Sequence, residues 1–418
     1  MKNPFAGEAT AVLKVKNFRY FLLFRICLTM GSLMMSVIVG WQVYEITKDV
    51  LWLGMIGLFE VIPQISISLF AGPFIDLWDR RKIIRRTILL LVLSASILLV
   101  YSIYIGKLSA WLGAYPIFIT IVLTGLARGI IAPSIVALLG QMVPRELYTN
   151  AATWNSATWQ ASAVLGPAIG GMVYGFLGII PAYSLVLALF ILAFFMITLV
   201  KTEKHVVPAG AAREGIFLRI KSGFRFVFAT PELLGAFSLD MFAVLFGGAV
   251  AMLPVFASDI LHVGPQGLGI LRACPSIGAT VMAFLLMFRP PTRETGKVLF
   301  IAVTGFGLCM VAFALSKNFF LSAAILILSG GFDNVSVVIR GTILQLFTPD
   351  EMRGRVASVN SIFIGSSNEL GAFESGVAAR IMGLVPSVIF GGVMTLLIVA
   401  VTAKFNKTLR SLSLKDKT

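Results

Sequence analysis

The chain has 418 residues, of which 58% are hydrophobic and 13% are charged, and its formal net charge at pH 7 is +15. A soluble protein carries about twice this fraction of charged residues, so the composition excludes a soluble globular protein and indicates an integral membrane protein. The positive charge does not indicate nucleic-acid binding, because the basic residues are spread between apolar runs and so favour anionic lipid headgroups at one membrane face.

Twelve apolar runs follow a basic, polar stretch at residues 1–17. Each run is close to the roughly 20 residues that a helix needs to cross the hydrocarbon core of a bilayer. The N-terminal stretch has no short apolar core with a small-residue cleavage site, so we expect the first run to remain as a membrane span. The sequence predicts an all-α integral membrane protein with twelve transmembrane helices, near 18–44, 50–76, 88–106, 115–139, 151–177, 180–200, 232–258, 267–289, 298–316, 320–346, 357–383 and 386–404.

The second and third runs are joined by a short basic loop, GPFIDLWDRRKIIRR, which begins at Gly72 and contains Asp76, Arg80 and Arg81. Gly-x-x-x-Asp before a basic run resembles the signature of this loop in the major facilitator superfamily, although Leu77 replaces a basic residue of the family pattern. The Asp-Arg-Arg-Lys run is similar to the version in the branch that holds enterobactin exporters and macrolide efflux pumps. The alternative is a plain cluster of positive charge that stops translocation of the chain.

The resemblance implies a conformational switch at this loop. In the resembled family, the aspartate of the loop pairs with the loop's arginine and with the positive end of span 11 in the outward-facing state. Here that implies contacts from Asp76 to Arg80 and to the backbone near 357–360. Gly72 and Arg81 complete the candidate switch.

Positive charge is distributed unevenly over the segments that separate the runs. On one side of the predicted spans, the segments together contain 26 Lys and Arg residues; these segments are 1–19, 77–87, 140–150, 201–230, 289–297, 347–357 and 404–418. The opposite loops contain only Lys48, Lys107 and Lys317. Because Lys and Arg are retained on the cytoplasmic side, we expect both termini in the cytoplasm and a multi-pass protein of the plasma membrane, which in a bacterium is the inner membrane.

One long polar segment divides the chain. Residues 201–231 separate six runs at 1–200 from six runs at 232–418, which predicts an N-terminal six-helix bundle, a cytoplasmic linker and a C-terminal six-helix bundle. Within the linker, residues 213–228 alternate basic and apolar side chains. This pattern predicts an amphipathic helix suited to lying on the inner leaflet.

The two halves also repeat. An offset of 205 residues aligns several small and polar residues in order and without gaps, including the pairs Gly166/Gly371 and Asn155/Asn360. Around the first two spans of each half, an offset of 215 fits better. Two parallel, pseudo-symmetric six-helix repeats match the architecture of the superfamily, which places the substrate site between the halves near the midplane.

Charged residues inside the spans indicate function, since a charge in hydrocarbon is costly and usually faces a cavity or a partner. Spans 3, 6, 9 and 12 carry none. In the resembled fold, spans 1, 4, 7 and 10 line the central cavity and spans 2, 5, 8 and 11 form the moving interface. The first group carries Arg25, Arg128, Asp240, Asp333 and Arg340, and the second carries Glu60, Arg272, Glu369, Glu374 and Arg380.

The repeat relates some of these charges. Arg128 and Asp333 are equivalent at offset 205, and Arg25 and Asp240 are equivalent at offset 215. Asp333 and Arg340 are seven residues apart and therefore lie on one helix face. We interpret the five residues as a substrate and proton-coupling site in which Asp240 and Asp333 titrate. The alternative is a structural ion pair that holds the helices together.

Span 5 contains small residues at helical spacing, in Ser162-x-x-x-Gly166-Pro167-x-x-Gly170-Gly171. This is similar to a motif of exporting members of the superfamily, with Ser162 in place of its first glycine. Gly166 and Pro167 are therefore candidates for a gating interface. The alternative is ordinary close packing of helices through small residues.

Span 11 contains polar residues that are unusual at membrane depth, namely Asn368, Glu369 and Glu374. The run is similar to that of the enterobactin-exporter branch. The two glutamates are about 140° apart around the helix, so they do not easily share a partner. Arg272 in span 8 is a candidate partner for Glu369, and the alternative is a buried structural role.

The residue patterns of common enzyme classes are missing from the sequence. Its two histidines, His205 and His262, are far from any metal-ligand cluster, and the three cysteines lie within apolar runs. No phosphate-binding loop or dinucleotide fingerprint occurs, so we expect no catalytic residue, no cofactor and no metal. Without an ATP-binding module, transport must use an ion gradient or the gradient of the substrate.

The resemblance implies a secondary active transporter that exports a medium-sized organic compound, siderophore or drug-like, by proton antiport and alternating access. The expected partners are a small organic substrate, protons and membrane lipids, with no nucleic acid, and the expected state is a monomer. A facilitator, an importer or a lysolipid flippase on the same fold remain alternatives. A membrane receptor or scaffold is the alternative from another class, and it would need no alternating access.

Overall fold

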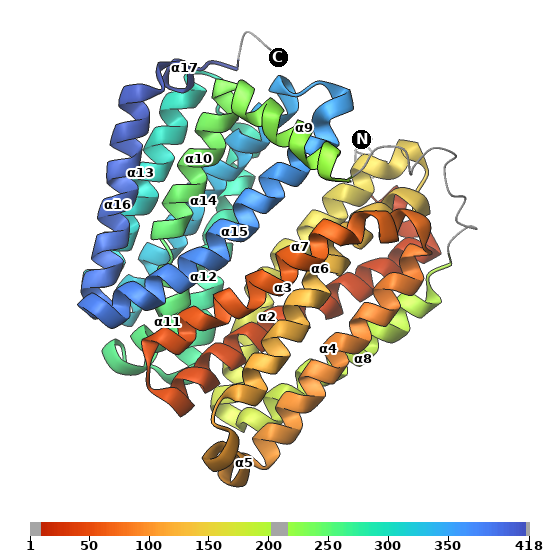
Figure 1. Cartoon of the computed structure of the whole chain (residues 1–418), viewed down its shortest axis with the longest axis vertical. Helices are drawn as coiled ribbons and strands as arrows, with labels where there is room; N and C mark the ends of the chain where they lie inside the picture. The colour runs from red at the N-terminus through yellow and green to blue at the C-terminus, as the bar shows by residue number, and fades with distance from the viewer. Residues whose placement is uncertain (1–9, 202–215, 415–418) are drawn as a thin grey trace, which may run out of the picture. The chain divides into compact units, whose positions relative to one another are not determined.

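The structure is a computed structural model that describes residues 10–201 and 216–414; at 69–77, 110, 145, 216–220 and 350 it describes the backbone alone. Throughout these ranges the regular elements are helices (Figure 1). The long helices are α2 (Lys16–Thr47), α3 (Val50–Leu77), α4 (Arg80–Ile103), α6 (Tyr115–Met142), α7 (Tyr148–Leu177), α8 (Ile179–Leu199), α10 (Pro231–Phe246), α12 (Gly264–Phe288), α13 (Thr295–Leu315), α14 (Phe319–Phe347), α15 (Asp350–Met382) and α16 (Leu384–Phe405). Short elements are η1 (Ala11–Lys14), α5 (Ile105–Leu112), η2 (Arg145–Leu147), α9 (Ile216–Ala229), η3 (Ala249–Met252), α11 (Leu253–Val255), η4 (Phe256–Ile260) and α17 (Lys407–Arg410).

The twelve long helices confirm the predicted all-α membrane protein. In the described part of the chain, eleven helical segments are long and apolar enough to cross a membrane, and one of them consists of α10 with the turns that follow it to Ile260. The twelfth, α15, has 33 residues and is also long enough, but it is rich in charged residues. These are Asp350, Glu351, Arg353, Arg355, Glu369, Glu374 and Arg380.

The chain divides into two compact units, and the boundary falls inside a helix. Unit 1 comprises residues 1–47 and 62–213, and unit 2 comprises residues 48–61 and 214–418. The first twelve residues of α3 therefore belong to unit 2, although the rest of that helix belongs to unit 1. The predicted division at 201–231 stays a prediction.

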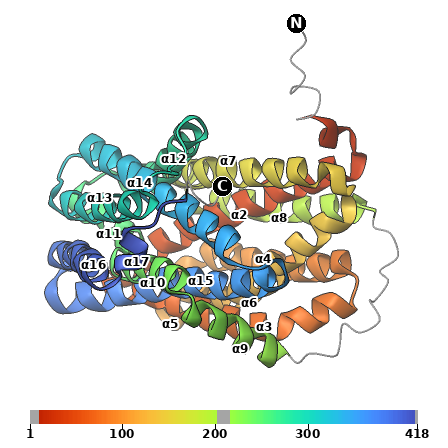
Figure 2. The ribbon, with the colours of Figure 1, turned by 90° about the horizontal axis from the view of Figure 1, so that it is seen from above.

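Each unit uses the same scheme of helix packing. In unit 1, α2 packs against α7 and α8, and α4 packs against α6 and α8. In unit 2, α10 packs against α15 and α16, and α13 packs against α14 and α16 (Figure 2). Counting from the start of each repeat, the first helix packs on the fifth and sixth, and the third packs on the fourth and sixth.

The equivalent glycines of the repeat also make equivalent contacts. A Cβ at Gly166 of α7 would lie 3.3 Å from the carbonyl oxygen of Met30 in α2. A Cβ at Gly371 of α15 would lie 2.8 Å from the carbonyl oxygen of Leu245 in α10. Both glycines thus let the fifth helix of a repeat approach the backbone of the first, which supports the repeat read from the sequence.

The span predicted at 232–258 is not one continuous α-helix. α10 ends at Phe246, and the chain continues through Gly247 and Gly248 into a 3₁₀ turn, the short α11 and a π-helical turn that ends at Ile260. Two consecutive glycines weaken the helix, and Pro254 cannot donate a backbone hydrogen bond. A Cβ at Gly248 would lie 2.6 Å from the Ser375 Oγ of α15, so the break also lets α15 come close.

The predicted amphipathic helix corresponds to α9, and its apolar side contacts protein. Val227 is fully buried, and the ring of Phe224 lies 6.2 Å from that of Phe363 in α15. The Arg355 Nη1 donates a hydrogen bond to the Ser222 Oγ at 3.0 Å. The helix therefore packs on the first turns of α15, and the predicted segment before Ile216 lies outside the described residues.

Candidate functional site

A buried ion pair joins α10 and α14 in unit 2. The Arg340 Nη1 lies 2.6 Å from the Asp240 Oδ2, and the two side chains are 6% and 7% exposed. Two charges within membrane spans are costly to desolvate, and direct contact offsets part of that cost. The pair places a carboxylate and a guanidinium in the interior of the unit.

Asp333 adds a second carboxylate to this pair. It precedes Arg340 by two helical turns on α14 and interacts electrostatically with both Arg340 and Asp240. The three side chains together carry a formal charge of −1 when all are ionised. We name Asp240, Asp333 and Arg340 the acidic triad.

Within the described residues, three buried polar atoms of α14, in or near the triad in sequence, have no hydrogen-bond partner. They are the Arg340 Nε of the triad itself, the Asn334 Oδ1 and the Ser336 Oγ. Buried polar atoms are nearly always paired in folded proteins, so unfilled ones indicate water or a ligand. This stretch of α14 is therefore equipped to bind a polar group.

In unit 1 the predicted cationic residues lie on the equivalent helices. The half-buried Arg25 of α2 donates a hydrogen bond from its Nε to the Asn155 Oδ1 of α7 at 3.0 Å. Arg128 lies half-buried on α6. Asp240, the counterpart of Arg25, thus has an ionic partner, whereas Arg25 has a neutral amide partner.

A second set of charges lies on α3, α12 and α15 within unit 2. Arg272 of α12 is half-buried and interacts electrostatically with Glu369 of α15 and with Glu60 of α3. This agrees with the predicted partnership of Arg272 and Glu369 and adds Glu60. Glu374, on another side of α15, accepts a long hydrogen bond of 3.5 Å from the Ser375 Oγ.

The first turns of α3 pack closely against α15 and are joined to it by an ion pair. The Arg380 Nη1 lies 2.5 Å from the Asp49 Oδ2, just before α3 begins. A Cβ at Gly54 would lie 2.9 Å from the Gly376 Cα, and one at Gly57 would lie 2.5 Å from the Glu369 carbonyl oxygen. The two backbones touch because glycines occupy the crossing. We name these contacts the α3–α15 crossing.

The residues of the basic loop bind the ends of other helices in unit 1. The Arg81 Nη1 donates to the carbonyl oxygen of Val200 after α8 at 2.8 Å, and the Arg80 Nη1 donates to that of Ala137 in α6 at 3.3 Å. Guanidinium groups near the C-terminal ends of helices also interact favourably with the helix dipole. The side chains of Gly72 and Asp76 lie outside the described residues, so the predicted pairing of Asp76 stays a prediction.

Gly166 and Pro167 are buried inside α7, at its crossing with α2. Gly170, one turn later, would place a Cβ 3.1 Å from the Met34 Cα. The motif thus forms a close helix contact within unit 1. Its role in gating stays a prediction.

Three features of the candidate site could not be predicted from the sequence. The Asp49–Arg380 pair joins residues 331 positions apart, and Gly54 and Gly57 lie on one face of α3 against α15. The Gly-x-x-Gly spacing was a signal for a close helix contact, but its partner could not be read from the sequence. The direct contact of Asp240 with Arg340 could not be predicted from the sequence either, since it depends on how α10 and α14 pack.

Comparison with known proteins identifies the family. Residues 8–417 match the family model described as a transmembrane secretion effector of the major facilitator superfamily. The chain belongs to this family of transporters. Transporters of the major facilitator superfamily move their substrates without chemical change, so the chain is a transporter and not an enzyme.

Individual relatives place it in the enterobactin-exporter branch of the superfamily. The chain is 26% identical to the enterobactin exporter EntS of Escherichia coli (strain SMS-3-5 / SECEC) over 313 residues, which cover 72% of this chain and 74% of that protein. It is 26% identical to the enterobactin exporter EntS of Salmonella typhi over 307 residues, which cover 70% of this chain and 72% of that protein.

Solved structures of the superfamily share the fold. A bacterial homologue of the human lysosomal transporter Spinster, inward-facing and unoccupied, superposes with a TM-score of 0.70 at 16% identity and covers 96% of this chain and 99% of its own. A D-xylose–proton symporter superposes with a TM-score of 0.73 at 13% identity, with coverage of 96% and 99%. These structures confirm the major facilitator fold that the basic loop and the repeat indicated.

Proposed function

We propose that this transporter exports a medium-sized organic compound, siderophore-like or drug-like, by proton antiport and alternating access. The observation that carries the proposal is the acidic triad inside the membrane-spanning part of unit 2, in which the Asp240 carboxylate contacts the Arg340 guanidinium and the Asp333 carboxylate interacts electrostatically with both. The enterobactin exporters among its relatives support the direction of transport and the size of the substrate.

The triad supports proton coupling through its charge. With Asp240 bound to Arg340, the carboxylate of Asp333 is the surplus negative charge on α14. A proton on Asp333 makes the triad neutral, and its release restores the net charge of −1. Because a net charge is costly in a membrane span, binding of a proton changes the stability of the conformation that buries the triad.

Substrate recognition is assigned to polar groups in both units. In unit 1, Arg128 of α6 is the candidate for binding a carboxylate, carbonyl or catecholate oxygen of the substrate. Arg25 of α2 is the second candidate cation for this role. In unit 2, the unfilled Asn334 Oδ1 and Ser336 Oγ supply hydrogen-bonding capacity beside the triad. Charge-assisted hydrogen bonds from a guanidinium are the stronger of these interactions.

Alternating access is supported by the divided helix α3. Its first turns are bound to α15 through the α3–α15 crossing, and its remainder packs in unit 1, where a Cβ at Gly129 would lie 2.6 Å from the Gln64 carbonyl oxygen. We assign Arg272, Glu369 and Glu374 to the interface that changes during the cycle. Release of α3 from α15 is the proposed opening step.

The proposed setting is the bacterial inner membrane, with both termini in the cytoplasm and the protein acting as a monomer. The asymmetry of 26 Lys and Arg against three supports this orientation. Under this orientation, Arg80 and Arg81 face the cytoplasm and the Asp49–Arg380 pair lies at the opposite face.

The proposed function is tested by proton flux in liposomes. The purified protein is reconstituted, and a pH-sensitive dye records proton movement after addition of a siderophore, a macrolide or a lysolipid. We expect one of the first two compounds to drive proton movement by the wild type. Asp333→Asn should still bind that compound but should no longer accumulate it against a gradient.

The matched control is Asp259→Asn, which removes an exposed carboxylate from unit 2 and should leave coupled transport unchanged. Transport of a compound by Asp333→Asn with undiminished proton flux would reject the coupling role of the triad. Movement of lysolipid without any proton gradient would instead support the flippase.

A further inference from the structure

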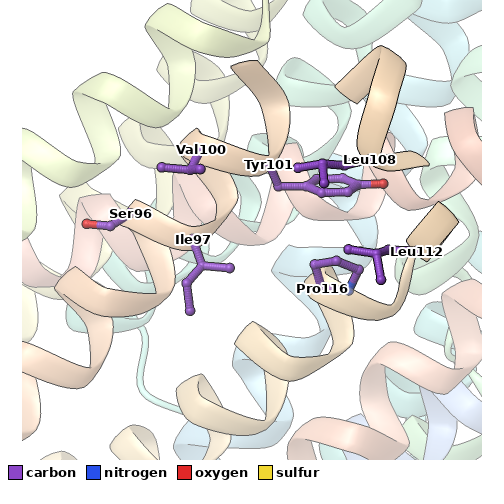
Figure 3. Close-up of a pocket in the computed structure, with 7 residues that line it drawn as sticks. All are labelled: Ser96, Ile97, Val100, Tyr101, Leu108, Leu112 and Pro116. Carbon is purple, nitrogen blue, oxygen red and sulfur yellow. The ribbon is translucent and has the colours of Figure 1, made fainter. Parts of the chain in front are cut away.

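Unit 1 contains an open pocket at the ends of two membrane spans. Its volume is about 320 Å³. It lies where α4 ends and α6 begins, and two residues of the connecting helix α5 complete its lining (Figure 3). The lining residues are Ser96, Ile97, Val100, Tyr101, Leu108, Leu112 and Pro116.

The pocket offers no free polar group to a ligand. Two of the lining side chains carry hydroxyl groups, and both are already engaged. The Tyr101 hydroxyl donates to the carbonyl oxygen of Gly113 at 2.5 Å, and the Ser96 Oγ donates to the carbonyl oxygen of Val92 at 2.8 Å. An occupant of the pocket therefore contacts hydrocarbon side chains and is itself apolar.

The rim of the pocket is polar and aromatic, in contrast to its interior. On α5, Leu108 and Leu112 line the pocket, whereas Lys107 and Trp111 do not line it and are exposed, Trp111 to 91%. Aromatic and cationic side chains at the ends of membrane spans are typical of the boundary between lipid and water. Tyr104 and Tyr115, both exposed, extend this rim on either side of α5.

We propose that the pocket binds one acyl chain of a membrane phospholipid, whose phosphate lies beside Lys107. The apolar interior fits the chain, and the exposed ammonium group at the rim complements the negative phosphate. The membrane is the source of the occupant, because the pocket lies at the ends of α4 and α6, two helices that are long and apolar enough to cross a bilayer. The bound lipid holds α5 against the ends of both spans.

The site is tested by photocrosslinking in proteoliposomes. The full chain is reconstituted with phosphatidylglycerol that carries a photoreactive group in one acyl chain. We expect labelled peptides from residues 96–116 in the wild type. Val100→Trp fills the pocket and should remove most of this labelling, whereas Leu89→Trp, an exposed position of the same helix outside the pocket, should not.

Lys107 provides a test that leaves the pocket intact. Lys107→Glu should reduce the labelling about fivefold, since one lysine contributes about 1 kcal/mol to the binding of anionic lipid at a membrane surface. Lys107→Arg should retain the wild-type level. Equal labelling of Val100→Trp and the wild type, equal labelling of both Lys107 variants, or displacement of the lipid by the transported compound would each overturn the proposal.

Discussion

Arg380, in the last turn of α15, forms an ion pair with Asp49, the residue that precedes α3. The arginine is 60% exposed, so the pair by itself contributes on the order of 0.5 kcal/mol. Its importance lies in its position, because α3 continues from this point into unit 1. A weak contact at the end of a shared helix can be broken in each transport cycle at small cost.

We therefore expect that a covalent link across this pair stops transport. In a background in which Cys27, Cys274 and Cys309 have been replaced, Asp49→Cys with Arg380→Cys is treated with a short two-armed thiol reagent that reducing agents cleave. Transport in liposomes should cease after treatment and return after reduction.

The matched control links two residues within unit 1. The Tyr174 hydroxyl donates to the Glu45 Oε2 at 2.6 Å, so Glu45→Cys with Tyr174→Cys offers a pair of similar span. Because both residues belong to unit 1, linking Glu45→Cys to Tyr174→Cys should leave transport unchanged. Full transport by the linked Asp49/Arg380 variant would instead favour a receptor or scaffold, which has no need of the movement.

The acidic triad makes a prediction about stability. Arg340→Met leaves Asp240 and Asp333 without their guanidinium, and breaking such a buried pair costs about 3–5 kcal/mol. Asp240→Asn should cost less, because Asp333 still faces Arg340. Thermal unfolding in detergent measures both changes.

Arg289→Met serves as the control for the triad, since Arg289 is exposed and its replacement should change the free energy of unfolding by less than about 0.5 kcal/mol. If Arg340→Met unfolds at the same temperature as this control, the ion pair does not stabilise unit 2.

The α3–α15 crossing predicts that a single methyl group is harmful at Gly57. The new Cβ would lie 2.5 Å from the Glu369 carbonyl oxygen and 2.9 Å from the Ala372 Cβ, so the helices must separate. Such overpacking costs about 1–3 kcal/mol, and Gly57→Ala should lower both the unfolding temperature and the transport rate. Gly341→Ala on α14 meets nothing within 4 Å and should be neutral or slightly stabilising.

The orientation of the chain is tested by thiol labelling in intact cells. Lys107 and Ser411 are both exposed, so a cysteine at either position can react. A membrane-impermeant reagent should modify Lys107→Cys and should leave Ser411→Cys unmodified until the cells are opened. Labelling of Ser411→Cys in intact cells would reverse the proposed topology.

The twelve spans could be predicted because hydrophobic length is encoded locally. Their ends were harder to predict, as span 3 shows. The sequence suggested that it starts at residue 88, after the basic loop, whereas α4 starts at Arg80. The Asp79 side chain accepts hydrogen bonds from the Arg81 and Lys82 amides, and this cap stabilises a helix start among the charges.

The contacts between distant helices could not be predicted in the same way. The spacing of Asp333 and Arg340 showed that they share a face of one helix, but Asp240 lies about a hundred residues earlier. Which helix packs beside α14 is a property of the whole bundle. The sequence thus indicated which side chains carry the charges of the candidate site, and the structure showed which of them meet.

The break after Phe246 makes the two repeats mechanically unequal. α2, the first helix of unit 1, runs for 32 residues without interruption, whereas its counterpart α10 stops after 16 and continues through glycine, 3₁₀ and π turns. Backbone amides outside a regular helical ladder open more readily, so residues 247–255 should exchange with deuterium faster than the matching stretch of α2. Under tension or thermal fluctuation, the second repeat therefore unfolds locally at residues 247–255 first, whereas α2 stays a continuous, rigid helix.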